Sequence, residues 1–168
     1  MIHSMKLVKW LTIAGFLGLS FSIQAKEYSL KEILAMSATP HGVVIEIVTG
    51  DDAGLSWALP KSQKIIQKLR DRFTDLPIAI VTHGREQFAL TKKRQNSSAV
   101  EHDAVNALMK DSKVQVHVCG TFAGWRGLNV EDFPEYVNVS AAGPAQINDY
   151  KSLGYLLLVV RSNSPLIE

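Results

Sequence analysis

Residues 43–48 read VVIEIV, a β-branched and almost continuously apolar run. Such a run is typical of a strand in a parallel sheet, where both faces of the strand are buried. The turn-forming sequence Thr49-Gly50-Asp51-Asp52 follows directly, so the strand is expected to end there. A strand buried on both faces requires neighbouring strands and covering helices, and the rest of the chain offers candidates for both.

Further runs of this kind follow along the chain. They lie at residues 78–82 (IAIVT), 114–119 (VQVHVC), 137–140 (VNVS) and 155–160 (YLLLVV). The run at 114–119 alternates between apolar and polar residues, and the run at 155–160 is strongly apolar. Both patterns are typical of strands. We therefore expect a sheet of about five strands.

Helical patterns separate these strands. Long helices are predicted at residues 60–73, 101–110 and 144–153, and short ones at residues 30–36, 85–90 and 122–126. Pro60 would lie in the first turn of its helix, and Ala104, Ala107 and Leu108 would face inward from the second long helix. The alternation of strands and helices predicts an α/β fold, with a mostly parallel sheet and helices on both faces.

The first 25 residues have the order of a secretory signal peptide. Lys6 and Lys9 precede an uncharged, mostly apolar run at residues 11–21, and the small residue Ala25 precedes Lys26. The apolar run has 11 residues, whereas a membrane span needs roughly 20. We expect cleavage after Ala25 and a periplasmic location, with an uncleaved anchor or a buried N-terminal helix as the alternatives.

Composition excludes several classes of function. The chain has a formal net charge of +2, but residues 1–25 hold two of its 18 basic residues and no acid, which leaves 16 basic and 16 acidic residues after cleavage. A neutral mature chain argues against a nucleic-acid partner, and no basic amphipathic helix is present to hold it on a membrane. One cysteine excludes an internal disulfide and a multi-cysteine metal or iron–sulfur site within one chain.

The 168 residues suit one folded domain with short extensions. We assign residues 26–41 to a lead-in segment, 42–161 to the α/β domain and 162–168 to a poorly ordered tail. The polar connection before residue 99 contains Lys92, Lys93 and Arg94. It is interpreted as a solvated loop, with contact to an anion as the alternative.

Polar and glycine residues follow three of the predicted strands. Ligands of open parallel sheets bind beyond the carboxyl ends of the strands, so these segments are expected at one edge. The segments are Thr49-Gly50-Asp51, Thr82-His83-Gly84 and Cys119-Gly120-Thr121. We predict ligand contacts from Gly50, Asp51, Gly84, Gly120 and Thr121, and from Arg126 after the third strand. For Asp51, capping of the next segment is the alternative to binding a cation.

Cys119 is the strongest single candidate for chemistry, because it is the only thiol and lies between a strand and a helix. Amides of the following helix would stabilise a thiolate, and Arg126 would add positive charge if that helix folds back. The alternative is a small buried apolar residue. His83 is a candidate base or orienting group, and its alternative is a turn histidine bonded to local backbone.

Metal binding is weakly supported by the residue pattern. His117 and Cys119 lie two apart on one strand and therefore on one face. Two ligands are too few to hold a soft metal. His41, His102 or a neighbouring subunit would have to complete the site, so no metal and no cofactor is predicted.

From Val43 to Val160 the chain resembles DsrE/DsrF-like proteins, a family that includes sulfur-relay subunits. Four stretches carry the resemblance: VVIEIVTGDD at 43–52, IAIVTHG at 78–84, VHVCGTFAGWRGLNVEDFP at 116–134 and VNVSAAGPAQINDYKSLGYLLLVV at 137–160. The most specific piece is a cysteine that ends a strand, followed by a short helix, an Arg-Gly-Leu turn and an acidic segment with an aromatic residue.

The resemblance implies a flavodoxin-like, three-layer α/β fold and homo-oligomers such as trimers or hexamers. It also implies a persulfide on Cys119, with a sulfur donor or acceptor protein as partner. The leading hypothesis is an exported persulfide carrier or sulfurtransferase with Cys119 as nucleophile and His83 assisting proton movement. The alternatives are a non-catalytic oligomeric module that binds a small ligand or metal at the same edge, and a structural subunit with a merely packed cysteine.

Overall fold

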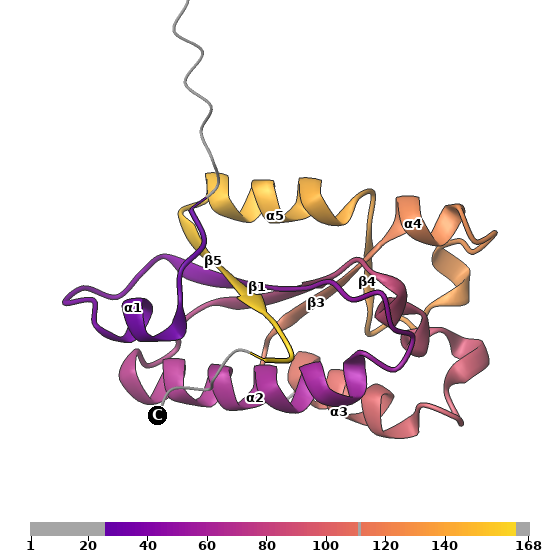
Figure 1. The fold of residues 1–168 in the computed structure, drawn as a ribbon, viewed down its shortest axis with the longest axis horizontal. Coiled ribbons are helices and arrows are strands. Elements are labelled where there is room, and N and C mark those ends of the chain that lie inside the picture. Colours follow the sequence, from indigo (N-terminus) through magenta and orange to yellow (C-terminus); the bar gives the residue numbers. More distant parts are fainter. Residues whose placement is uncertain (1–25, 111, 164–168) are drawn as a thin grey trace, which may run out of the picture.

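A computed structural model describes residues 26–110 and 112–163, and within them the strands form one five-stranded sheet. The order is β4-β3-β2-β1-β5, and every neighbouring pair is parallel (Figure 1). The strands are β1 (Gly42–Ile47), β2 (Ile78–Thr82), β3 (Gln115–Cys119), β4 (Asn138–Ser140) and β5 (Tyr155–Val160). The predicted α/β, flavodoxin-like fold class is confirmed.

β1 owes its apolar sequence to its place between β2 and β5. Val43 pairs with Ile78 on one side and with Leu156 on the other. The residues of β1 are buried except Glu46, which is partly exposed. A strand paired on both edges and covered on both faces has few positions for polar side chains, so the single acid within β1 marks an unusual position.

Helices cover both faces of the sheet, which makes three layers. Figure 1 shows α5 (Gly143–Ser152) on one side and α2 (Leu55–Arg72) with α3 (Ala99–Lys110) on the other. The short helix α1 (Leu30–Leu34) packs beside α2. The remaining elements are the short helix α4 (Gly120–Gly124) and the 3₁₀ turns η1 (Arg85–Leu90), η2 (Lys92–Arg94) and η3 (Val130–Asp132).

The two faces of the sheet bury very different amounts of apolar surface. The larger cluster fills the space between the sheet and α1, α2 and α3, and includes Ile45, Leu69 and Ile80. The smaller cluster lies on the α5 side and consists of Val44, Ala79, Val81, Ile147 and Leu157. The thinner apolar layer under α5 leaves room on that face for polar side chains.

The structure corrects two predictions about the helices. α2 begins at Leu55 rather than at residue 60, so Pro60 lies inside the helix instead of in its first turn. Leu55, Ala58 and Leu59 are buried, and their burial opposes the cost of the amide hydrogen bond that Pro60 cannot make.

In α3 the inward face differs from the predicted one. His102, Val105 and Leu108 are buried, while Ala107 is exposed and Ala104 is intermediate. Residues three apart share a helix face, so the buried set forms one stripe. Leu108 therefore faces inward as predicted and Ala104 packs against the edge of the core, whereas the exposed Ala107 contradicts the prediction.

The other predicted elements agree with the structure to within about two residues, the usual uncertainty of element boundaries. Gly127 after α4 and Gly154 after α5 have positive φ angles of 72° and 86°, which glycine adopts without strain. Residues 1–25, with the predicted signal peptide, and residues 164–168 of the predicted tail lie outside the described residues. Within the described ranges, no helix has the length and apolar character needed to cross a membrane.

Candidate functional site

The three predicted segments lie at the carboxyl ends of neighbouring strands. Thr82 and Cys119 end β2 and β3, and Thr49 follows β1 by two residues. β1, β2 and β3 are adjacent and parallel, so these ends share one edge of the sheet. The order of the strands therefore brings together residues that are far apart in the sequence.

Cys119 lies at the N-cap of α4, where its side chain replaces the usual oxygen acceptor. Its Sγ accepts a hydrogen bond from the backbone N–H of Phe122 at 3.4 Å. The residue is 5% exposed. An amide N–H at the start of a helix is a favourable donor to a negatively charged acceptor, and here that donor points at the sulfur.

Gln87 holds the backbone of Cys119 in place. Its Oε1 accepts from the N–H of Cys119 at 2.7 Å, and its Nε2 donates to the carbonyl of Cys119 at 3.2 Å. The Gln87 side chain is fully buried. Two hydrogen bonds to one peptide position restrict how the end of β3 moves and so orient the sulfur towards α4.

A buried carboxylate joins the ends of β1 and β2. Glu86 is fully buried and accepts hydrogen bonds from the N–H of Thr49 at 2.7 Å, the N–H of Gly84 at 2.8 Å and the hydroxyl of Thr82 at 2.5 Å. A buried carboxylate needs several donors to offset its lost hydration. Glu86 therefore connects the two loops at this edge.

His83, which follows β2, forms a pair with Glu46 of β1. Its Nε2 lies 2.7 Å from the Glu46 carboxylate, and both side chains are largely buried. Thr82 pairs with Val118, so His83 and Cys119 are the next residues in register. His83 also packs against Gly143 of α5, where an added Cβ would collide with the imidazole. The side chain thus bonds across the sheet rather than to the backbone of its own turn.

His117 belongs to a polar network beneath α5. Its Nδ1 lies 2.9 Å from Ser140 Oγ, and its Nε2 lies 2.8 Å from the Tyr150 hydroxyl. Ser140 Oγ in turn donates to Gln146 at 2.9 Å, so Nδ1 carries the proton and Nε2 accepts from Tyr150. Burial lowers the pKa of His117 below its ordinary value. The network holds a neutral imidazole between β3 and α5.

The histidines considered for a metal site are not brought together. His41 lies beside Gly154, at the amino end of β1, and His102 bonds to the Tyr136 hydroxyl at 2.5 Å. Among the described residues, no group of three or more histidine, cysteine and acidic side chains is arranged to hold a metal ion.

Most of the predicted ligand contacts shape the edge rather than line an open cavity. An added Cβ at Gly84 would collide with Glu86, and one at Gly120 would lie 2.9 Å from the Ser140 carbonyl. Thr121 donates its N–H and hydroxyl to the Ala141 carbonyl at 2.9 and 2.7 Å. These close approaches allow the loops after β2, β3 and β4 to pack together.

The other residues that were predicted to contact a ligand are less tightly packed. Asp51 accepts from the N–H of Ala53 at 3.0 Å, which is the local capping role given as its alternative. Gly50 is exposed, with open space where a Cβ would lie. The guanidinium of Arg126 lies over the rings of Phe88 and Phe122, 5.8 Å from each centroid.

Sequence reasoning missed Glu46, Glu86 and Gln87. Glu46 had a visible signal, since it is the only polar residue in an otherwise apolar run. Glu86 and Gln87 had none, because two polar residues in a short helix usually face solvent. Their contacts reach residues 37 and 32 positions away, respectively, so only the tertiary arrangement reveals them.

The fold defines the class of protein as a three-layer α/β protein with an all-parallel, flavodoxin-like sheet. No protein-family model matches the chain, and no curated protein matches it. Solved structures do match it. One is the YchN protein from E. coli, with a TM-score of 0.51, 14% identity and coverage of 71% of this chain and 99% of that one.

A second similar structure is MTH1491 from Methanobacterium thermoautotrophicum, described as a protein of unknown function. It has a TM-score of 0.51 and 16% identity, and covers 71% of this chain and 99% of that one. Both neighbours share the three-layer α/β fold of this chain. The fold implied by the sequence resemblance is therefore confirmed, and at this level of identity the likeness concerns the fold alone.

Proposed function

We propose that this chain is an exported DsrE/DsrF-like protein that handles sulfur, with Cys119 as the persulfide-carrying nucleophile. The observation that supports this most directly is the hydrogen bond from the Phe122 N–H to the Cys119 Sγ at the start of α4. A sulfur that accepts from a helix-terminal amide is stabilised as an anion. Both the thiolate and its persulfide are anions that this amide would stabilise.

The transfer step needs no external oxidant. The Cys119 thiolate attacks the outer sulfur of a persulfide, polysulfide or thiosulfate donor, so a new S–S bond forms. The donor's own bond to that sulfur breaks, and its electron pair leaves with the donor as a thiolate or, from thiosulfate, as sulfite. A second thiolate removes the sulfur in the same way.

His83 and Glu46 supply proton handling in this proposal. His83 follows β2 next in register to Cys119, where an imidazole accepts the thiol proton and returns it to the departing donor group. The Glu46 carboxylate, 2.7 Å from His83 Nε2, fixes the orientation of the ring. Glu46 is thus a positioning residue.

Surface features support assembly and contact with a sulfur partner. Trp125, just after α4, is 77% exposed, and Val48, just after β1, is 47% exposed. An exposed tryptophan beside the site offers a large apolar contact to a partner surface. We propose that a homo-oligomer, such as a trimer or hexamer, covers part of this edge. Periplasmic export with cleavage after Ala25 is part of the proposal, and detecting the protein in the periplasm with Lys26 as its first residue tests it.

The deciding experiment is intact-mass measurement of the purified protein after incubation with thiosulfate or polysulfide. We expect a one-sulfur adduct on the wild type and none on Cys119→Ser, and cyanide should remove the adduct. A thiol that resists both sulfur donors and alkylating reagents would contradict the proposal. That result would favour the alternative, a non-catalytic module that binds a small ligand or metal at this edge.

A further inference from the structure

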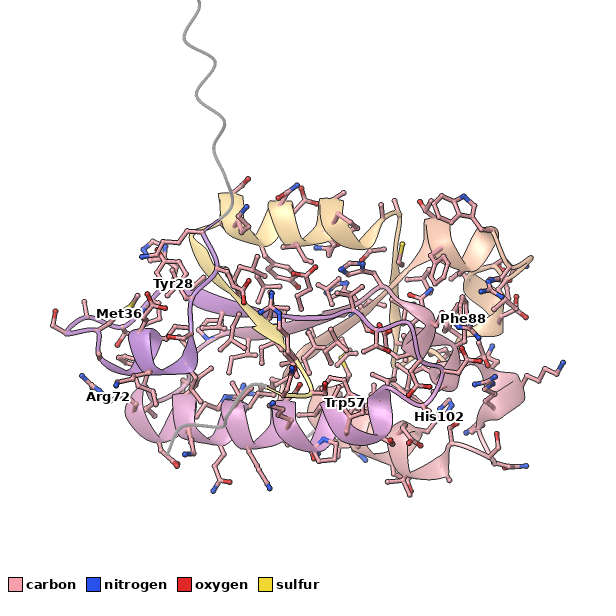
Figure 2. The ribbon with its side chains drawn as sticks, in the orientation of Figure 1. Tyr28, Met36, Trp57, Arg72, Phe88 and His102 are labelled. Carbon is pink, nitrogen blue, oxygen red and sulfur yellow. The ribbon has the colours of Figure 1, made fainter. Side chains whose placement is uncertain are left out.

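We propose that an open groove beside α4 and η2 binds a small organic anion with an apolar body. The groove has a volume of about 680 Å³, within the range of small-molecule sites. Phe88 and Leu128 supply its apolar lining, and Lys93, Arg94 and Arg126 supply positive charge. Figure 2 places Phe88 at the α4 end of the molecule, opposite the end that holds Tyr28 and Met36.

Phe88, which lines this groove, belongs to a cluster of aromatic rings whose other two members, Phe122 and Trp125, do not line it. The Phe88 and Phe122 rings lie 5.3 Å apart, and Trp125 contacts Phe122 edge-on at 5.9 Å. The Arg126 guanidinium lies over the first two rings. A cation held against aromatic faces loses less side-chain freedom when it binds an anion. Arg126 is therefore already restrained where an anion would meet it.

The acids of the groove are occupied by other partners. Asp52 accepts from Arg85 at 2.7 Å and from Arg94 at 3.4 Å, and the Arg85 hydrogen bond lowers the pKa of Asp52 below its ordinary value. Asp132 accepts from the backbone N–H of Asn129 at 2.8 Å. Asp52 thus has cationic partners of its own and Asp132 has a backbone donor, and among the described residues neither carboxylate forms an ion pair with Lys93 or Arg126.

Lys93 and Arg126 are the cations left for a ligand. Within residues 26–110 and 112–163, neither has a carboxylate partner. Lys92 belongs to the same turn but does not line the groove. The basic run at 92–94 is therefore not uniform, because one of its lysines faces this site and its neighbour does not.

These features define the chemistry of the ligand. A carboxylate or sulfonate headgroup would bridge Lys93 and Arg126, since charge-assisted hydrogen bonds to oxyanions are the strongest that these side chains make. An aromatic or aliphatic body would rest on Phe88 and Leu128 and lose its contact with water. An inorganic anion would contact only Lys93 and Arg126, without the apolar residues, and would therefore bind more weakly.

The site is separate from the thiol, because Cys119 does not line the groove. We therefore expect that occupancy of the groove does not require the thiol. A Cys119→Ser variant should bind the same ligand as the wild type, so failure of either proposal leaves the other intact.

The test uses 8-anilinonaphthalene-1-sulfonate, an aromatic sulfonate, and its uncharged relative N-phenyl-1-naphthylamine, both followed by fluorescence titration. We expect the wild type to bind the sulfonate saturably. Arg126→Gln or Lys93→Gln should each raise the dissociation constant about tenfold, because each variant loses one charge-assisted contact. Arg126→Lys should retain most of the affinity. The matched control Lys92→Gln should bind like the wild type.

Two results would overturn the proposal. One is equal affinity for the sulfonate and the uncharged probe, which would reduce the groove to an apolar surface. The other is equal weakening by Lys92→Gln and Lys93→Gln, which would reduce it to diffuse surface charge. Near-ultraviolet circular dichroism of every variant shows that the tertiary packing is intact, because these probes also bind loosely packed states.

Discussion

The two faces of the sheet differ in what they bury. The face under α2 and α3 carries the larger apolar cluster, whereas the face under α5 combines a small cluster with the Glu46–His83 pair and the His117 network. Cys119, two residues after His117 on β3, belongs to the α5 face. The main apolar core and the polar candidate site thus lie on different faces of the sheet, because polar groups are accommodated where the apolar layer is thin.

Truncating a core side chain should give the largest effect, and it tests whether the two faces contribute unequally to the free energy of unfolding. Leu69→Ala, on the α2 face, should lower the free energy of unfolding by about 2–5 kcal/mol, because Leu69 is fully buried in the larger cluster. Ile147→Ala, on the α5 face, should fall at the lower end of that range. Urea unfolding of both variants measures the difference, and equal losses would show that the faces contribute alike.

Replacing the buried carboxylate at the site edge should have the next largest effect. Glu86 accepts hydrogen bonds from three donors. In Glu86→Gln the new NH₂ group would face at least one of these donors, and it cannot accept a hydrogen bond from it. We expect a loss of about 1–3 kcal/mol in unfolding free energy, the cost of an unsatisfied buried group. Glu135→Gln, at an exposed position, is the control and should be nearly neutral. A neutral Glu86→Gln would mean that the carboxylate does not hold the loops.

Removing the charge that orients His83 tests the chemistry of the α5 face. Glu46→Gln should slow persulfidation of Cys119 about tenfold while leaving the final adduct unchanged, because proton transfer then depends on a poorly oriented base. The rate is followed by intact mass across pH, again with Glu135→Gln as the control. An unchanged rate and pH profile would assign the pair a structural role only.

The smallest expected effect is the pH dependence contributed by His117. Its folded pKa lies below its unfolded value because of burial, so the unfolded state binds more protons as the pH falls below about 6.5. Stability should therefore decrease from neutral pH down through the folded pKa and gain nothing above pH 7. Urea unfolding between pH 7.5 and 5 measures this, and His117→Gln should show a shallower decline. An identical slope in the variant would contradict the assignment.

Much of the fold was predictable from local patterns. The strands at 78–82 and 155–160 match the structure to the residue, because short apolar β-branched runs have one stable environment, the interior of a sheet. The start of α2 was not predicted, since Pro60 was given more weight than the apolar positions Leu55, Ala58 and Leu59. Tertiary burial outweighed a local preference there.

The candidate site was predictable only in part. Cys119 and His83 were identified because each lies at the end of a predicted strand, where parallel sheets collect their functional groups. The proposed roles of Gln87 and Glu46 depend on pairings across the sheet. Their contacts join residues 32 and 37 positions apart, and no local pattern encodes such distances.

The sequence by itself determined the order of strands and helices and the position of the single thiol at the end of a strand, because periodicity and turn residues act over a few neighbouring positions. Only the tertiary structure decided the strand order β4-β3-β2-β1-β5 and, through it, which side chains meet. Glu46 contacts His83, Gln87 holds Cys119, and Arg126 joins Lys93 at one groove. The physical reason is that these contacts follow from burying both faces of one sheet at once, a requirement that no segment meets alone.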